Sequence, residues 1–95
     1  MIDLRHLRTF CAVTETSSFT LAATRLGCSQ STVTTHIQAL ESELGARLFD
    51  RSRFTKDVAL TASGQQTLIY SRQLLELAEQ VPSLIQPRVP EESPV

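Results

Sequence analysis

Apolar residues recur every three or four positions over most of the first half of the chain, with polar residues between them. This spacing puts the apolar side chains on one face of a helix. Asp3, Ser18 and Ser29 each precede such a stretch, and their side chains are good helix N-caps. The pattern therefore predicts three helices in succession, of which the second ends at Gly27 and the third at Gly45.

The third predicted helix has a narrow apolar stripe, which runs from Val33 to Leu44. Its first turn is rich in serine and threonine, which lower helix propensity. A face that only keeps a protein soluble more simply uses glutamate and lysine. Rotation by about 100° per residue places a polar set opposite the stripe. This set consists of Ser31, Thr35, Gln38 and Ser42, with Thr34 on its flank.

Two short apolar runs, residues 48–49 and 58–60, enclose a polar segment. They indicate a small β-hairpin, although no Asn-Gly or glycine-rich turn marks its tip. Residues 61–81 then predict a long final helix, which Thr61 or Ser63 could cap. All four prolines fall within residues 82–94, so residues 87–95 are expected to be extended or disordered.

The final helix carries two apolar stripes, which suggests that it packs against two partners. Leu68 and Leu75 form one stripe, suited to packing within its own domain. The other stripe is the candidate contact with a second chain. It consists of Tyr70, Leu74, Leu77, Val81 and Leu84.

Length and charge limit the classes of protein to consider. The chain has 95 residues, enough for one small domain, and a net charge of −1, which argues weakly against nucleic-acid binding. Basic residues nevertheless outnumber acidic ones four to one within residues 47–56. The sequence shows no signal peptide or apolar run long enough to span a membrane, and its two cysteines suit a reducing compartment. We therefore expect a cytoplasmic protein.

Residues 19–44 combine a short helix with two small alanines, a glycine-bearing turn and a second helix. This is the pattern of a helix-turn-helix, in which the second helix presents its N-terminal half to the DNA major groove. Gln30 and Gln38 can make paired contacts with adenine, and Thr34 and Thr35 can contact bases or phosphates. The same shape also serves as a plain structural corner, so the pattern alone leaves both readings open.

The chain resembles the N-terminal DNA-binding domain of LysR-type transcriptional regulators. The resemblance runs in register over most of residues 2–85. It rests on Leu4-Arg5-His6-Leu7-Arg8-x-Phe10, Ser18-Phe19-Thr20-x-Ala22-Ala23-x-x-Leu26, Ser29-Gln30-Ser31-x-Val33, Ile37-x-x-Leu40-Glu41-x-Glu43-Leu44-Gly45, Leu48-Phe49-Asp50-Arg51 and Leu60-Thr61-x-x-Gly64.

The resemblance implies a mostly α fold: a winged helix-turn-helix over residues 1–60, made of three helices and a small β-hairpin wing. A linker helix over residues 61–86 would follow, and residues 87–95 would begin the hinge to an absent effector domain. In the family the linker helix forms a homodimer, and full-length members usually act as tetramers. Their inducer site lies in the C-terminal domain, so we expect no cofactor or small-molecule ligand for this segment.

Family roles carry over to matching positions. Gln30 and Ser31, with Thr34, Thr35 and Gln38 further along the helix, are expected to contact bases in double-stranded DNA. The resemblance also implies contacts with phosphates or the minor groove, the latter from the wing. The residues expected there are Thr20, Ser29, Thr32, Arg51, Arg53 and Lys56.

Three departures from the family pattern affect these contacts. The family more often has proline at the position of Ser31 and often has arginine at that of Thr35. The segment from Leu48 to Thr61 is about two residues longer than the common pattern. These departures affect base preference and wing contacts and leave the fold unchanged.

Other functions have little support in the sequence. The histidines and cysteines lack zinc-ligand spacing, so we expect no metal, and His36 is expected to be a partly buried spacer. Glu41 and Glu43 point to different sides of a helix, which disfavours acid–base catalysis, so we expect no enzyme. The alternative to DNA binding is a winged-helix module for protein interaction or dimerisation, whose active feature would be the long amphipathic helix.

Overall fold

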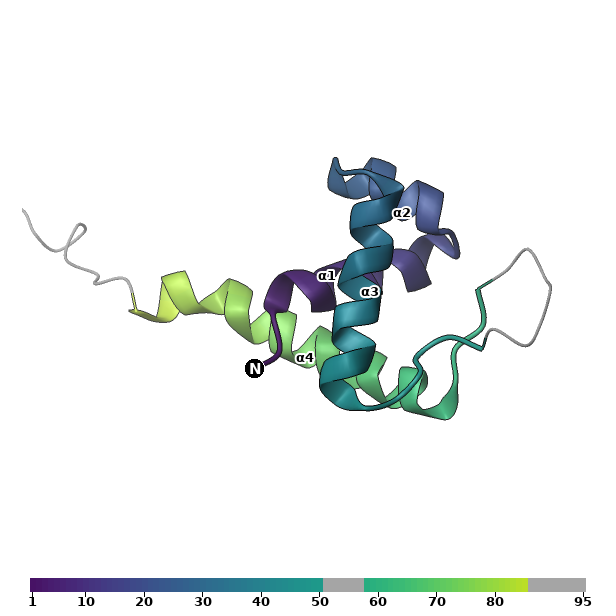
Figure 1. Cartoon of the computed structure of the whole chain (residues 1–95). Helices are drawn as coiled ribbons and strands as arrows, with labels where there is room; N and C mark the ends of the chain where they lie inside the picture. The colour runs from purple at the N-terminus through teal and green to yellow at the C-terminus, as the bar shows by residue number, and fades with distance from the viewer. Residues whose placement is uncertain (51–57, 86–95) are drawn as a thin grey trace, which may run out of the picture.

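The computed structural model describes residues 1–50 and 58–85 and contains four helices. Figure 1 shows α1, α2 and α3 grouped as one unit, with α4 passing along one end of it. The far end of α4 projects beyond the unit (Figure 1). The helices are α1 (Leu4–Thr16), α2 (Phe19–Leu26), α3 (Gln30–Leu44) and α4 (Ala62–Ile85).

The three predicted N-caps are confirmed. The Asp3 carboxylate accepts the Arg5 N–H at 2.8 Å, and the Ser18 hydroxyl accepts the Leu21 N–H at 3.0 Å. The Ser29 hydroxyl accepts the Thr32 N–H at 3.1 Å. Each side chain thus satisfies a backbone donor that has no partner within its own helix.

One buried apolar cluster holds α1, α2 and α3 together. Phe10 and Val13 of α1, and Val33, Ile37 and Leu40 of α3, are fully buried in it. Leu44, the last residue of the predicted stripe, is 37% exposed because α3 ends there. The core thus forms where the apolar faces of the three helices meet.

The segment that follows α3 returns to the core, and its two ends form a β-bridge with each other. Leu48 and Phe49 are buried, and Phe49 forms an isolated antiparallel bridge with Leu60. The Asp50 N–H donates to the Ala59 carbonyl at 2.8 Å. The two ends of the predicted hairpin therefore meet as expected. They form a single bridge rather than strands in the described residues, and residues 51–57 lie outside these.

The final helix starts as predicted and ends later. Thr61 caps it, since its hydroxyl accepts the Gly64 N–H at 2.9 Å. The end at Val81 that the residue pattern predicts is wrong, because the helix continues through Pro82 to Ile85, within the range 61–86 that the resemblance implies. A proline within a helix removes one backbone hydrogen bond, and here this loss does not end the helix. In the two described ranges, no helix is long and apolar enough to cross a membrane.

Candidate nucleic-acid interface

The turn between α2 and α3 sets the position of α3. Gly27 ends α2 in the left-handed conformation with φ of 72°, which is costly for residues with a Cβ. The next N–H, from Cys28, donates to the Ala23 carbonyl at 3.0 Å. Ala22 and Ala23 are buried, and their small size lets a neighbouring helix approach α2 closely. This geometry is that of a helix-turn-helix.

The outer face of α3 contains the residues predicted to contact bases. Four of them are exposed and Thr34 is half-buried. All five lie away from the stripe of Val33, Ile37 and Leu40 that enters the core. The structure therefore brings them together on one polar face. The exposed four are Gln30, Ser31, Thr35 and Gln38.

Hydroxyl groups gather at the N-terminus of α3. The Ser29 Oγ lies 3.0 Å from the Ser31 Oγ and 2.9 Å from the Thr32 Oγ1, in addition to accepting the Thr32 N–H. The backbone N–H groups at a helix N-terminus carry partial positive charge, which favours an anion. This end of α3 therefore combines polar side chains with a local preference for negative charge.

The sequence pattern does not predict one contact that joins α2 to α3. The Thr20 hydroxyl donates to the Gln30 side-chain oxygen at 3.1 Å. Both residues are exposed. Thr20, which is expected to contact phosphate, and Gln30, which is expected to contact bases, are thus joined by a hydrogen bond.

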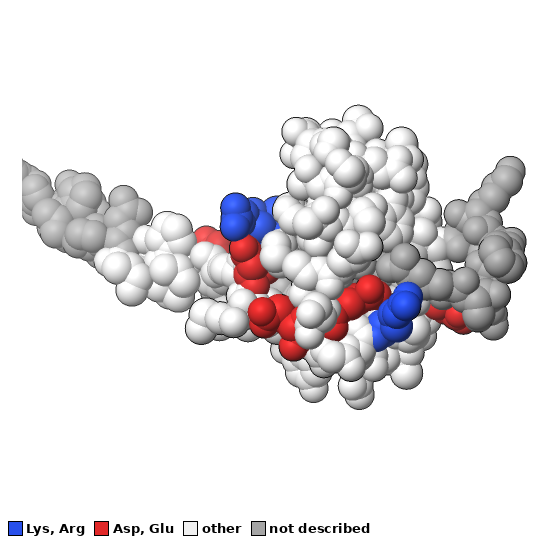
Figure 2. Space-filling view, in the orientation of Figure 1, with Lys and Arg blue, Asp and Glu red and all other residues white. Residues whose placement is uncertain are grey.

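The N-terminal half of α3 is free of charged side chains, as Figure 2 shows at the upper end of the molecule. Acidic residues instead gather near its C-terminal end, where the Glu43 carboxylate lies 3.4 Å from the N-terminal amino group of Met1 (Figure 2). Arg25 of α2 is paired with Glu15 of α1 at 2.7 Å. The remaining predicted phosphate and wing residues lie outside the described residues. These are Arg51, Arg53 and Lys56.

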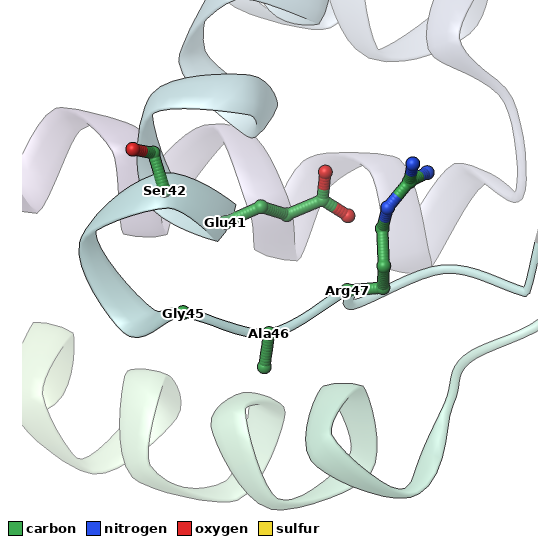
Figure 3. Close-up of a pocket in the computed structure, with 5 residues that line it drawn as sticks. All are labelled: Glu41, Ser42, Gly45, Ala46 and Arg47. Atoms are coloured by element: carbon green, nitrogen blue, oxygen red, sulfur yellow. The ribbon is translucent and has the colours of Figure 1, made fainter.

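The C-terminal end of α3 forms a second, separate polar region. A shallow pocket of 310 Å³ lies there, and the Glu41 side chain extends from α3 toward that of Arg47 (Figure 3). The Glu41 carboxylate accepts the Leu48 N–H at 2.9 Å. Glu41 and Glu43 therefore have different partners. The Glu41 bond fastens the segment after α3 to the helix.

His36 lies on the flank of α3 and faces α1. Its ring centroid is 4.7 Å from that of His6. Burial lowers the pKa of His36, and the nearby positive charges of His6 and Arg5 lower it further. These effects favour the neutral imidazole, and the side chain is half-buried, as the sequence predicts for a spacer.

The two predicted stripes of α4 have different environments. Leu75 is buried and Leu68 packs against the core. All five residues of the second stripe are exposed, with exposed fractions from 46% at Val81 to 63% at Leu84. Hereafter this set is called the α4 stripe. It consists of Tyr70, Leu74, Leu77, Val81 and Leu84.

A pocket of 120 Å³ adjoins the N-terminal half of the α4 stripe. Tyr70 and Leu74 line it together with Leu44 from α3 and Ile2 from the start of the chain. Ser71, also in its lining, is 1% exposed, and its hydroxyl has no hydrogen-bond partner within the described part of the chain. The apolar surface thus extends from α4 onto the three-helix unit.

Comparison with known proteins agrees with this geometry. Residues 4–65 match the family model described as bacterial regulatory helix-turn-helix protein, lysR family. The chain is 49% identical over 78 residues to the uncharacterized HTH-type transcriptional regulator YnfL of Escherichia coli (strain K12), covering 82% of this chain and 26% of the relative. It is 44% identical over 78 residues to the HTH-type transcriptional regulator TfdT of Cupriavidus pinatubonensis (strain JMP 134 / LMG 1197), covering 82% and 33%.

The protein chains in two solved DNA complexes have a fold similar to that of this chain. The first is the BenM_DBD/catB site 1 DNA complex, with a TM-score of 0.82 and 39% identity, covering 92% of this chain and 93% of that one. The second is the CbnR_DBD–DNA complex, with a TM-score of 0.78 and 38% identity, covering 85% and 91%.

The fold and the polar face of α3 thus define a helix-turn-helix protein of the regulatory type. The chain belongs to the lysR family of bacterial regulatory helix-turn-helix proteins. It spans about a quarter to a third of the length of the curated relatives named above.

Proposed function

We propose that this chain is a sequence-specific, double-stranded-DNA-binding domain of a bacterial transcription regulator. The observation that carries the proposal is the exposed polar face of α3, whose N-terminal half is held outward by the capped turn after α2. A helix presented in this way fits the major groove. The similar BenM and CbnR domains are in complexes with DNA, which supports the same partner here.

Base contacts are assigned to the outer face of α3, with Gln30 and Ser31 at its start. The backbone of the duplex would be contacted by Ser29 and Thr32 at the N-terminus of α3 and by Thr20 on α2. The basic residues Arg51, Arg53 and Lys56 would supply positive charge to phosphates or the minor groove from the wing. Because these side chains are few, we expect a modest dependence of affinity on salt.

A homodimer through the α4 stripe would place two copies of α3 on the half-sites of an interrupted palindrome. Exposed apolar surface of this extent, continuous with the pocket beside Ser71, is typical of an interface. A pair of identical faces gives two-fold symmetry, which matches a palindromic operator. The alternative, a dimerisation module that does not read DNA, would use the same stripe and leave the face of α3 without a role.

The proposal also divides the chain into three parts with different roles. Residues 1–60 would form the DNA-binding domain, residues 61–86 the linker helix, and residues 87–95 the start of a hinge. In the full-length protein, which would be a tetramer, a C-terminal domain would bind the small-molecule inducer. The segment would thus be a binding domain rather than an enzyme, and its attachment to the chromosome would place it in the nucleoid.

Fluorescence anisotropy tests the proposal on two duplexes at several salt concentrations. One contains an interrupted palindrome of the T…A kind, and the other has the same flanks with a scrambled centre. We expect tighter binding to the palindrome, with two chains per duplex, and loss of this preference in Gln30→Ala. If neither duplex binds at low salt, the dimerisation module becomes the better description.

A further inference from the structure

The hydrogen bond between Thr20 and Gln30 joins the two helices at the point where a duplex would be read. Thr20 is the second residue of α2 and Gln30 the first of α3, and the donor–acceptor distance is 3.1 Å. The caps Ser18 and Ser29 fix the backbone at both positions. A β-branched side chain has few χ1 conformations, so α2 leaves few positions for the Thr20 hydroxyl.

The number of hydrogen-bond donors on Thr20 and Gln30 limits which further hydrogen bonds each side chain can form. A threonine hydroxyl has a single hydrogen, and here it goes to the Gln30 oxygen. While that bond lasts, the Thr20 hydroxyl cannot donate to a phosphate oxygen, which only accepts, so the bond to Gln30 replaces the phosphate contact that the family resemblance implies for Thr20. The Gln30 amide keeps both N–H donors, whereas one of the two acceptor sites on its oxygen is occupied.

We infer that Thr20 is a positioning residue for base recognition, because its hydroxyl holds the Gln30 amide so that the NH₂ group faces the bound duplex. The inference rests on the proposed function and goes beyond it by assigning a base preference. An NH₂ group turned toward the major groove binds acceptors: guanine N7 and O6, thymine O4 or adenine N7. Cytosine offers only its N4 amino donor there, so Gln30 held in this way disfavours cytosine as the base that it contacts, on whichever strand that base lies.

Without the Thr20 hydroxyl the Gln30 amide can turn by about 180° and present its oxygen to a donor such as cytosine N4. The bond is exposed in the free protein, where water competes with it. Once a duplex covers the face and excludes water, the bond becomes stronger. The effect of Thr20 is therefore expected in base preference rather than in the stability of the free domain.

Selection from a pool of duplexes with randomised centres, followed by sequencing, tests this without a known operator. The base position read by Gln30 is identified as the one whose preference disappears in Gln30→Ala. At that position, the duplexes selected by the unmodified chain should be depleted of cytosine on one strand, which identifies the strand whose base Gln30 contacts. Thr20→Val, which has nearly the same shape but no hydroxyl, should raise the frequency of cytosine there about tenfold.

Two variants serve as controls. Thr20→Ser keeps the hydroxyl and should keep cytosine rare. Thr24→Val removes another exposed hydroxyl of α2, one that donates to the Thr20 carbonyl rather than to Gln30, and should not change the preference. Thermal melting of each variant checks that the domain stays folded.

Three results would overturn the inference. In the first, Thr20→Val leaves cytosine as rare as before and lowers affinity equally for all sequences, which makes Thr20 a phosphate contact. In the second, the duplexes selected by the unmodified chain are depleted of cytosine on neither strand at the Gln30 position. In the third, the pool is not bound at all, and the proposed function fails together with the inference. If the pool is bound but Thr20→Val does not change the base preference, only the inference fails. If the pool is not bound, the proposed function fails as well.

Discussion

The Oγ1 of Thr9 lies 2.8 Å from the Nδ1 of His36, and this contact links α1 to α3. The Thr9 hydroxyl also donates to the Arg5 carbonyl at 3.0 Å. Its single hydrogen is used in that bond, so the contact with His36 requires an Nδ1–H donor. In this arrangement the neutral His36 ring carries its proton on Nδ1. The histidine thus anchors the flank of α3 to the buried Thr9 side chain.

Replacing Thr9 with valine should destabilise the domain by about 1 kcal/mol. Valine fills the same volume, so the loss reflects the hydrogen bonds of the hydroxyl with His36 and with the Arg5 carbonyl rather than packing. Urea denaturation followed by circular dichroism measures the change. Thr24→Val, at an exposed position, should change stability by less than about 0.5 kcal/mol. Equal stability of Thr9→Val and the unmodified chain would show that water replaces the bond at no cost.

The stability of the domain should fall as the pH is lowered through 6.5. Burial and the charges of His6 and Arg5 place the pKa of His36 below its ordinary value of 6.5, which the unfolded chain keeps. The unfolded state then binds more protons in the window below 6.5, so the stabilisation is complete above that pH and is lost as the pH falls toward the lowered pKa.

Urea midpoints measured from pH 8 to pH 5 check this dependence, with His36→Gln as the reference that lacks the titrating ring. Asp3 does not interfere, because its hydrogen bonds with Arg5 hold the pKa of that carboxyl far below this range. A slope with pH that is the same in His36→Gln and in the unmodified chain would assign the effect to another group.

Gly64→Ala should destabilise the domain by about 1–3 kcal/mol through crowding. Gly64 is buried in the first turn of α4, and an added methyl would collide with the Leu48 carbonyl oxygen and meet the Leu60 side chain at 3.0 Å. The Leu48 carbonyl cannot move freely, because it accepts the Thr61 N–H at 3.0 Å. A fall in Tm of roughly 5–20 °C is expected. Ser63→Ala, next to it and exposed, should leave Tm nearly unchanged.

The first three helices could be predicted from local sequence because their ends carry specific backbone chemistry. Asp3, Ser18 and Ser29 each cap a helix, and Gly27 and Gly45 end helices with positive φ. The end of α4 could not be predicted in the same way. A proline that is expected to end a helix lies inside it, and nothing in the local sequence distinguishes the two outcomes.

The polar face of α3 could also be predicted, since helical periodicity alone determines which residues oppose Val33 and Ile37. The pairs Thr9–His36 and Thr20–Gln30 could not, because their members are 27 and 10 residues apart in the chain. Such contacts depend on how two helices cross, and periodicity does not encode the crossing. The contacts that orient the candidate site are therefore known only from the fold.

Leu77→Glu should convert a dimer into a monomer without unfolding it. Leu77 is 57% exposed at the centre of the α4 stripe, so a charge there costs the isolated chain little. In a dimer that buries the stripe, the same charge would be desolvated beside its symmetry-related copy. Sedimentation velocity should show the monomer, while Tm extrapolated to low concentration stays close to that of the unmodified chain. Binding to a palindromic duplex should weaken and fit one chain per half-site.

Gln65→Glu places the same charge on another exposed part of α4 and should preserve the dimer. A dimer that persists in Leu77→Glu would place the interface elsewhere, whereas a monomer that still binds both half-sites cooperatively would show that DNA, rather than α4, couples the two copies.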